Sequence, residues 1–419
     1  MKKIKSFLSR NLLLRTLPQL RGNPRACLYL EPFWGIPYNL YAPFVSVYMA
    51  ALGMTPVQIG FVSTVFFASQ MVFALLSGPL TDKLGRRKCT LIFDCISWSI
   101  PTFLWMCAQN YAWFIVAALF NGVWRVTENS WDLLLIEDAP EDQLVTLYSI
   151  SHVAGLLAGF VTPLAYIFVQ KFGLVPTVRV LYGFACAMMT FKFVTLYFWS
   201  RETRVGEKRM RECKNMSVWA SVRGSLTVLK TMVRNRRIVR VVIFMACFAA
   251  LKNVNDTFWP LLVRDKLLIA EENLSIFSTA KSLMMLACYF VITPHLHADH
   301  FRHPLRLGLM LFLLEQVLML LLRPGMYAAI ILGVMLEAVA LSMLNPLMQS
   351  VQVAAMDVNE RARMMGLSFA LSMLVTSPVG TLAGVLSEIN RSLPLCMNLG
   401  FVAVCLYLSC RISEKKESM

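Results

Sequence analysis

Apolar runs of about 20 residues recur along the whole chain and constrain its fold more than any other feature. A run of this length crosses the hydrocarbon core of a bilayer as a helix, whereas a barrel strand needs only about 10 residues of alternating polarity. Backbone groups in lipid must find their hydrogen-bond partners within the protein, and a helix provides them locally. Only 15% of the 419 residues are charged and 57% are hydrophobic. The sequence therefore predicts an all-α polytopic membrane protein.

Twelve such runs are present, six on each side of the polar segment 201–237. Their approximate limits are 27–51, 56–80, 89–108, 111–135, 146–170, 176–200, 238–263, 274–293, 304–322, 326–350, 363–386 and 392–410. We therefore expect two pseudo-symmetric bundles of six transmembrane helices, at 27–200 and 238–410. A basic linker at 201–237 joins them, and tails at 1–26 and 411–419 flank them.

Lys and Arg residues fall mostly on one side of the predicted membrane. With the N-terminus inside, thirty of the 40 Lys and Arg residues lie in inside loops and tails, and five lie in outside loops. Basic residues are retained on the cytoplasmic side of a membrane during insertion. We therefore expect a multi-pass plasma-membrane protein with both termini and the linker in the cytoplasm. The net charge of +16 then indicates topology and contact with anionic lipids rather than nucleic-acid binding.

The segment between the second and third predicted spans reads GPLTDKLGRRK at residues 78–88. It resembles the loop signature of the major facilitator superfamily, in which glycine, leucine, an aspartate, a basic residue, glycine and a basic pair follow in order. The resemblance implies a twelve-helix secondary transporter whose halves rock about a central site near the midplane. Its glycines permit close packing and a tight turn, and its charges can lock the two halves together. The residues expected to form this conformational lock are Gly78, Asp82, Gly85, Arg86 and Arg87.

The corresponding segment of the second half, DHFRHP at residues 299–304, keeps the acid and the basic residue but lacks the glycine. A matching lock in the second half is therefore not assured. Four histidines fall between residues 295 and 303, with no cysteine near them. We interpret them as part of a solvated loop, and we expect no metal site and no cofactor.

Charged side chains within the spans are candidate functional groups, because a charge at the bilayer centre costs about 2.5–3.5 kcal/mol on insertion scales. Arg125 and Glu128 on the fourth span can pair at i,i+3, as can Lys252 and Asp256 on the seventh at i,i+4. A role in substrate or proton handling is favoured, and a purely structural salt bridge is the alternative. The candidate substrate- or proton-coupling residues are Tyr38, Asn39, Arg125, Glu128, Asp132, Lys252, Asn255, Asp256 and Glu337. We expect the two pairs to meet between the halves.

Other charges within the spans are scattered and are interpreted as structural or as snorkelling toward the interface. They include Asp94, Lys192, Lys281 and Glu315. Glu31 lies about one turn from the cytoplasmic end of the first span, and both interpretations stay open for it. Pro32, Pro37 and Pro43 should bend or break that span.

The motifs of ATP-driven pumps and of membrane hydrolases do not occur in the sequence: G-x-x-x-x-G-K-[ST], H-E-x-x-H and G-x-S-x-G are all missing. We therefore do not expect the protein to be an enzyme. We expect a secondary active transporter that moves a small polar or amphiphilic solute by alternating access. Protons are the simplest coupling ion. A non-transporting membrane sensor or scaffold on a transporter fold is the alternative. The expected partners are the solute, protons or another coupling ion, and membrane lipids, with no nucleic acid, and we expect a monomer.

Overall fold

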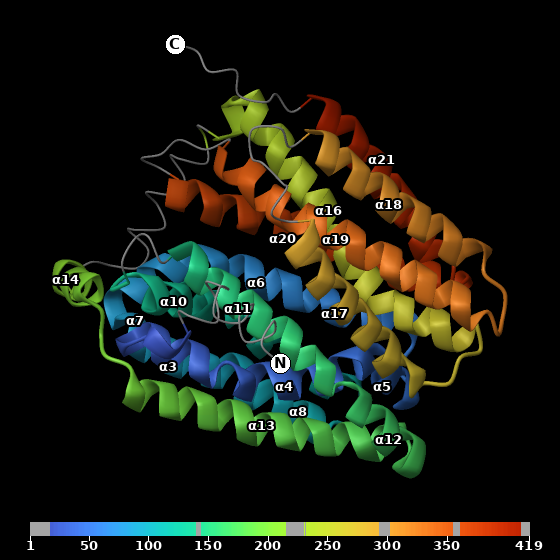
Figure 1. The fold of residues 1–419 in the computed structure, drawn as a ribbon, viewed down its shortest axis with the longest axis horizontal. Coiled ribbons are helices and arrows are strands. Elements are labelled where there is room, and N and C mark those ends of the chain that lie inside the picture. Colours follow the sequence, from blue (N-terminus) through green and yellow to red (C-terminus); the bar gives the residue numbers. More distant parts are fainter. Residues whose placement is uncertain are drawn as a thin grey trace, which may run out of the picture.

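The computed structural model describes residues 17–139, 144–214, 230, 232–292, 302–354 and 361–411. Within these residues all regular structure is helical. Figure 1 shows two halves, one above the other, with the first half coloured blue to green and the second yellow to red. Each half contains six helical segments at the positions of the predicted spans. The predicted all-helical fold of two six-helix bundles is thereby confirmed.

Four of the six predicted spans in the first half are interrupted helices. A 3₁₀ turn, η1 (Leu17–Gln19), precedes them. The first span comprises α3 (Gly22–Leu30), α4 (Pro32–Tyr41), η2 (Ala42–Phe44) and α5 (Val45–Ala51), and the second is α6 (Pro56–Leu84). The third comprises α7 (Arg86–Asp94), the π-helical turn η3 (Cys95–Ser99) and α8 (Ile100–Cys107). The fourth comprises α9 (Tyr111–Asn121) and α10 (Trp124–Ile136). The fifth comprises α11 (Leu144–Ala158), η5 (Gly159–Val161) and α12 (Pro163–Phe172), and the sixth is α13 (Leu174–Trp199).

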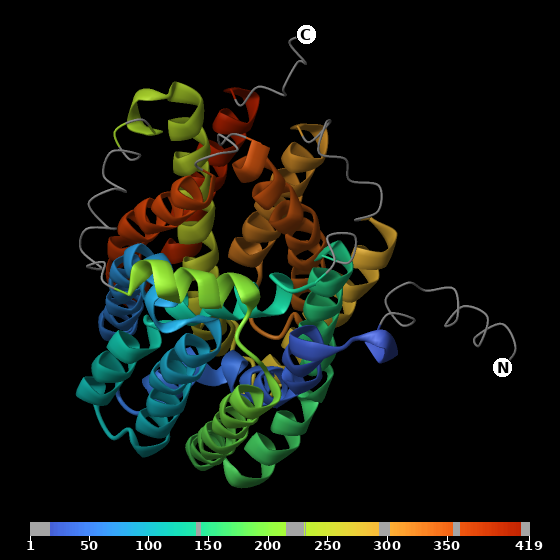
Figure 2. The ribbon, with the colours of Figure 1, turned by 90° about the vertical axis from the view of Figure 1, so that its left-hand side faces the viewer.

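The second half consists of single long helices. They are α16 (Arg236–Asp265), α17 (Asn273–Val291), α18 (Arg302–Leu321), α19 (Tyr327–Ala354), α20 (Arg361–Ile389) and α21 (Leu393–Arg411). A further helix, α14 (Arg204–Cys213), belongs to the linker. It projects beyond the first half in Figure 1 and lies across the end of that bundle in Figure 2. We call this end of the molecule the linker end and the opposite one the far end.

The interruptions of the first span follow its prolines. Pro32 occupies the first turn of α4, where its missing N–H does not matter, and Pro43 lies in the 3₁₀ turn η2. Pro37 lies inside α4, where a proline removes one helical hydrogen bond. The first span is therefore a chain of short helices, as the sequence predicts.

Nine helical segments among the described residues are long and apolar enough to cross a membrane. The first and the fourth predicted spans lie outside this set. The first is broken into short pieces, and the fourth carries Arg125, Glu128 and Asp132. Polar groups in a span are tolerated where the helix faces protein or water rather than lipid. These two spans are therefore well suited to face the interior.

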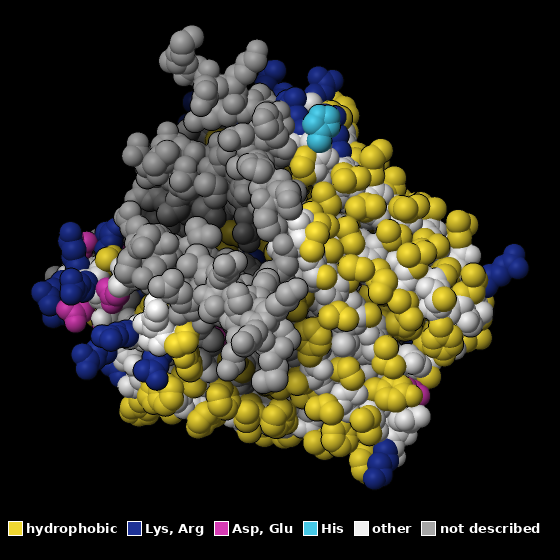
Figure 3. All heavy atoms as spheres, in the orientation of Figure 1, with side chains coloured by type: hydrophobic (Ala, Val, Ile, Leu, Met, Phe, Trp, Pro, Cys, Tyr) yellow, Lys and Arg dark blue, Asp and Glu magenta, His cyan; other side chains and the backbone are white. Residues whose placement is uncertain are grey.

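The flanks of the molecule are apolar. Figure 3 shows a surface dominated by hydrophobic side chains along the lower and right-hand flanks, with Lys and Arg side chains gathered over α14 at the left. Large apolar residues such as Val180, Phe198 and Leu321 are mostly exposed. A soluble protein would not leave so much apolar surface in water. The distribution is that of a protein whose sides lie in lipid and whose ends lie in water.

Helices α6 and α20 make the closest contact between the halves. A Cβ atom added at Gly60 would lie 2.0 Å from the carbonyl oxygen of Gly380, and one at Gly384 would lie 2.5 Å from that of Pro56. Only glycine allows two helix backbones to approach this closely. The contact therefore depends on glycines supplied by both halves.

Hydrogen bonds between the halves lie toward the far end. The Thr64 hydroxyl donates to the carbonyl oxygen of Ser377 at 2.6 Å, and the Arg264 guanidinium donates to that of Val47 at 3.5 Å. Among the described residues, every first-half residue that hydrogen-bonds to the second half lies within 47–64. Within the described part of the chain, the hydrogen bonds that fasten the halves therefore lie toward the far end.

The variant Gly60→Ala should be less stable than the wild type, because its methyl group must displace the α20 backbone and overpacking costs about 1–3 kcal/mol. Thermal unfolding of the purified protein in detergent measures the effect. Gly366→Ala is the control, since a Cβ atom at Gly366 of α20 meets nothing within 4 Å. The control should be as stable as the wild type or slightly more so. Unchanged unfolding of Gly60→Ala would contradict the close contact.

Candidate functional site

The charged stripe of the fourth span lies on α10. Arg125 forms an ion pair with Glu128, and its Nε donates to Oε1 of Gln70 on α6 at 3.2 Å. The same guanidinium lies over the ring of Phe369 on α20, 4.6 Å from the centroid. The charge of Arg125 is thus compensated within the first half, while its flat face touches the second half. A group placed in this way can respond to movement between the halves.

The polar residues of α16 point in two directions. Asn255 is buried, and its Nδ2 donates to Oε1 of Glu337 at 2.8 Å. The same oxygen accepts from Nζ of Lys281 at 2.7 Å. Lys252 and Asp256 are exposed instead, and no ion pair joins them within the described part of the chain. Asp256 lies in electrostatic range of Lys281, so the strongest interactions of this region involve the eighth span.

No ion pair among the described residues joins the two charge pairs that we expected to meet between the halves. Arg125 reaches the second half through Phe369, and no hydrogen bond or ion pair among the described residues links α10 to Lys252 or Asp256. Glu128 is 38% exposed and satisfies Arg125 locally. Since each charge already has water or a local partner, nothing draws the pairs together in this conformation.

The remaining candidates lie in the first half. The ring of Tyr38 stacks on that of Trp34 with centroids 4.9 Å apart, and it meets Trp98 edge-on at 5.9 Å. Nδ2 of Asn39 donates to the carbonyl oxygen of Gly35 one turn earlier, at 2.7 Å. Asp132 is half-buried and lies about two turns after Arg125 on the same face of α10. These residues form an aromatic and polar surface on α4 and α10.

A buried ion pair that the sequence interpretation did not single out joins the first and sixth spans. Nζ of Lys192 on α13 donates to Oε2 of Glu31 at 2.7 Å, and Lys192 is only 4% exposed. Its ammonium also lies 5.8 Å from the ring centroid of Trp34 and 5.6 Å from that of Trp131. Each charge is isolated on its own span. Spacing along one helix therefore gives no sign that they meet.

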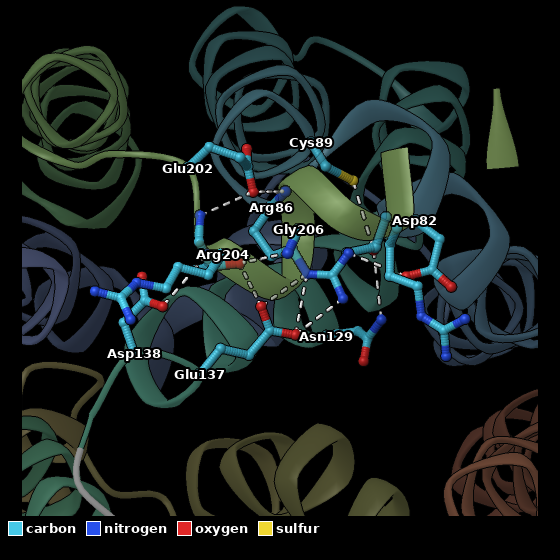
Figure 4. Close-up of polar contacts among 12 residues, drawn as sticks. Asp82, Arg86, Cys89, Asn129, Glu137, Asp138, Glu202, Arg204 and Gly206 are labelled. Carbon is cyan, nitrogen blue, oxygen red and sulfur yellow. Dashed lines mark hydrogen bonds and ion pairs between the residues drawn. The ribbon is translucent and has the colours of Figure 1, made fainter. Parts of the chain in front are cut away.

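The signature at residues 78–88 forms the polar cluster drawn in Figure 4. Arg86 is 3% exposed and donates to Asp82 at 3.0 Å and to Glu137 at 2.9 Å. The Glu202 carboxylate accepts from the backbone N–H groups of Arg86 and Arg87, at 2.9 and 3.1 Å. A carboxylate at a helix N-terminus satisfies free N–H groups and the helix dipole. The signature thus ties α6, α7, the end of α10 and the linker together within the first half.

The glycines of the signature differ in their surroundings. Gly85 joins α6 to α7 with a φ of +82°, a conformation that favours glycine, and a Cβ atom there would lie 2.6 Å from Glu202 Oε2. Gly78 lies inside α6, and a Cβ atom there would meet nothing within 4 Å. The close packing expected at Gly78 is therefore not formed among the described residues. The corresponding segment of the second half, residues 299–304, lies partly outside the described residues, so the lock between the halves stays a prediction.

The histidine-rich segment can be described only in part. His303 lies in the first turn of α18, whereas residues 295–300 lie outside the described residues. Among the described residues, no group of three or more His, Cys, Asp or Glu side chains could hold a metal ion. The interpretation of the segment as a loop stays a prediction.

The structure is that of a polytopic membrane protein with the architecture of a transporter. It has two helical bundles with apolar flanks, paired charges inside the spans, and a basic signature between the second and third spans. The family model described as Major Facilitator Superfamily matches residues 34–380. The chain belongs to the major facilitator superfamily.

Solved structures of transporters share this fold. A variant of the nucleoside transporter NupG superposes with a TM-score of 0.74 at 13% identity, over 93% of this chain and 99% of that one. A POT family transporter in complex with a thioalcohol-conjugated peptide gives 0.71 at 13% identity, over 93% and 95%. The human organic anion transporter MFSD10 (TETRAN) gives 0.64 at 16% identity, over 92% and 99%. At these identities the likeness establishes the fold alone.

One sequence relative resembles a shorter stretch. The quinolone resistance protein NorA of Staphylococcus aureus is 30% identical over 91 residues, which is 22% of this chain. The match spans 23% of the length of NorA.

Glu31→Gln should strongly destabilise the protein, because it leaves the Lys192 ammonium buried without a counter-charge. Breaking a buried pair in this way costs about 3–5 kcal/mol. The double variant Glu31→Gln, Lys192→Gln should recover much of this loss, as thermal unfolding in detergent would measure. Glu207→Gln is the control, since Glu207 pairs with Arg211 on the exposed surface of α14 and surface pairs contribute little. A double variant no more stable than Glu31→Gln would contradict the assignment.

Proposed function

We propose that this protein is a secondary active transporter that moves a small polar or amphiphilic solute across the plasma membrane by alternating access, coupled to protons. The observation that carries the proposal is the accessibility of charged groups inside the spans. Glu128 is 38% exposed, and Lys252 and Asp256 are exposed on α16 although most of that helix is buried. Charges cannot face lipid at this depth. They are best accounted for by a hydrated path between the halves.

The unequal fastening of the two ends supports alternating access. The halves are joined toward the far end through the glycine contact of α6 with α20 and through Thr64 and Ser377. At the linker end the charges of Asp82 and Arg86 are compensated within the first half. Among the described residues, the halves are thus joined at the far end while the signature makes its contacts within the first half, an arrangement that would correspond to one of two access states. In the second state we expect the signature to engage the second half.

The chemistry between the halves supports a solute that combines polar and flat apolar parts. Arg125, Glu128 and Asp256 offer charges of both signs, while Trp34 and Tyr38 offer stacked rings. The printed names of the similar proteins concern nucleosides, a conjugated peptide, organic anions and quinolone resistance. These ligands are all small and polar or amphiphilic. The similarity therefore favours a solute class without singling out one compound.

The function is tested by a thermal-shift screen of the full-length protein against nucleosides, short peptides, organic anions and quinolones, followed by uptake into proteoliposomes. A ligand that binds the folded state raises the melting temperature. We expect the best ligand to accumulate faster when a pH gradient is imposed. The double variant Arg125→Gln, Glu128→Gln should stay folded but lose most of this uptake. Normal uptake with unaltered pH dependence in the double variant would make the pair structural.

The orientation of the protein is a separate prediction. We expect the linker end to be cytoplasmic, because Lys and Arg are concentrated there. In a cysteine-free background, Lys214→Cys after α14 should be labelled by a membrane-impermeant thiol reagent only after cells are opened. Leu268→Cys, in the exposed turn after α16 at the far end, should be labelled in intact cells. The opposite pattern would reverse the topology. The background is needed because none of the eleven native cysteines is in a disulfide.

A further inference from the structure

A chain of buried amides in the second half leads to one ion pair. Nδ2 of Asn398 on α21 donates to Gln316 on α18 at 3.1 Å, Gln316 donates to Asn255 at 3.0 Å, and Asn255 donates to Glu337 at 2.8 Å. Lys281 completes the chain at 2.7 Å from the same Glu337 oxygen. Each of these hydrogen bonds is donated in the direction of Glu337. Glu337 is therefore stabilised as a carboxylate, and with Lys281 it forms an electrically neutral pair.

Glu315 adds a second carboxyl group to this neutral network. It is 0% exposed, and its Oε2 accepts from Nε2 of Gln316 at 2.6 Å. Its Oε1 is buried without a hydrogen-bond partner among the described residues, and so is Oδ1 of Asn398. No cation lies within ion-pair distance of Glu315 in the described part of the chain, because Lys281 is bonded to Glu337. An ionised Glu315 would thus be an uncompensated charge in a dry interior.

We propose that Glu315 binds the coupling proton of this transporter. The proposal rests on the proton-coupled transport proposed above and names a residue for it. A neutral carboxylic acid at this position carries no charge, and its O–H provides a donor in a network where the buried Oδ1 of Asn398 lacks one. The site thereby loads one proton per cycle.

The neighbouring charges supply a way to release the proton. From α17, Lys281 is 26% exposed and can leave Glu337. On α16, Asp256 is exposed in electrostatic range of Lys281, and Lys252 is exposed one turn before it. α19 contributes Glu337, and α21 contributes the uncharged Asn398. When Lys281 moves toward Glu315, an ionised carboxylate gains a counter-charge and the proton leaves to water. Movement of the halves or solute binding near Asp256 can drive this exchange.

Infrared difference spectroscopy of the purified full-length protein near neutral pH tests the proton directly. We expect the carbonyl-stretch band of a protonated carboxyl group in the wild type, and we expect Glu315→Gln to lose it. The amide has the shape of the neutral acid, so this variant should stay folded. Glu337→Gln should keep the band, because Glu337 is ionised beside Lys281. Glu388→Gln, which changes an exposed acid on α20, should also keep it. An unchanged band in Glu315→Gln would overturn the proposal.

Uptake into proteoliposomes separates this proposal from the proposed function. The probe is the compound that gives the largest thermal shift. For the wild type we expect uptake to rise when a pH gradient is imposed. For Glu315→Gln, uptake with the gradient should equal uptake without it. This variant should still exchange the probe across the membrane at equal pH. Wild-type uptake insensitive to pH would refute proton coupling, even if the infrared band is lost. pH-driven uptake that survives in Glu315→Gln would refute the role of Glu315 alone. Uptake that follows a sodium gradient instead would overturn both.

Discussion

The compensation of charge inside the bilayer is the constraint on which this structure depends. A charged side chain removed from water needs a counter-charge or a hydrogen-bond network within the protein. Lys192 meets this need with Glu31, and Lys281 meets it with Glu337. Both pairs join spans that are distant in the sequence, so each also fixes how helices pack within its half. The bundles are therefore held by apolar packing and oriented by a small number of polar contacts.

The two halves differ in how they solve the same problem. The first half surrounds its pair with aromatic rings, since the Lys192 ammonium faces Trp34 and Trp131. The second half surrounds its pair with amides, and in Asn255 and Gln316 both the amide nitrogen and the amide oxygen are hydrogen-bonded. Aromatic faces favour a fixed cation, whereas an amide network can stabilise or neutralise a carboxylate. In the mechanism proposed above, the aromatic first half therefore provides most of the solute contacts, and the amide network of the second half handles the proton.

The contact between the halves is made mainly by backbones and short side chains. Glycine surfaces on α6 and α20 bring backbones together without interlocking side chains. The hydrogen bonds beside them are few and use short hydroxyl groups such as Thr64 and Ser377. At the linker end, Glu202 holds the start of α7 from the linker side. The signature is therefore coupled to the segment that connects the halves, which places the linker where it can sense their movement.

The sequence by itself determined the helical spans, their grouping into two halves, the turn at Gly85 and the local pair of Arg125 with Glu128. These features follow from apolar run length, from backbone conformation and from contacts three or four residues apart, all of which are local. Only the tertiary structure decided that Lys192 meets Glu31 and that Lys281, rather than Lys252, pairs with Glu337. It also decided that Glu315 is left without a cation among the described residues. Those outcomes depend on which faces of distant helices pack together. Helical periodicity predicts that a charge faces inward, but the partner it meets there is set by a neighbouring helix. For Lys192 and Glu31 the two partners are 161 residues apart in the chain.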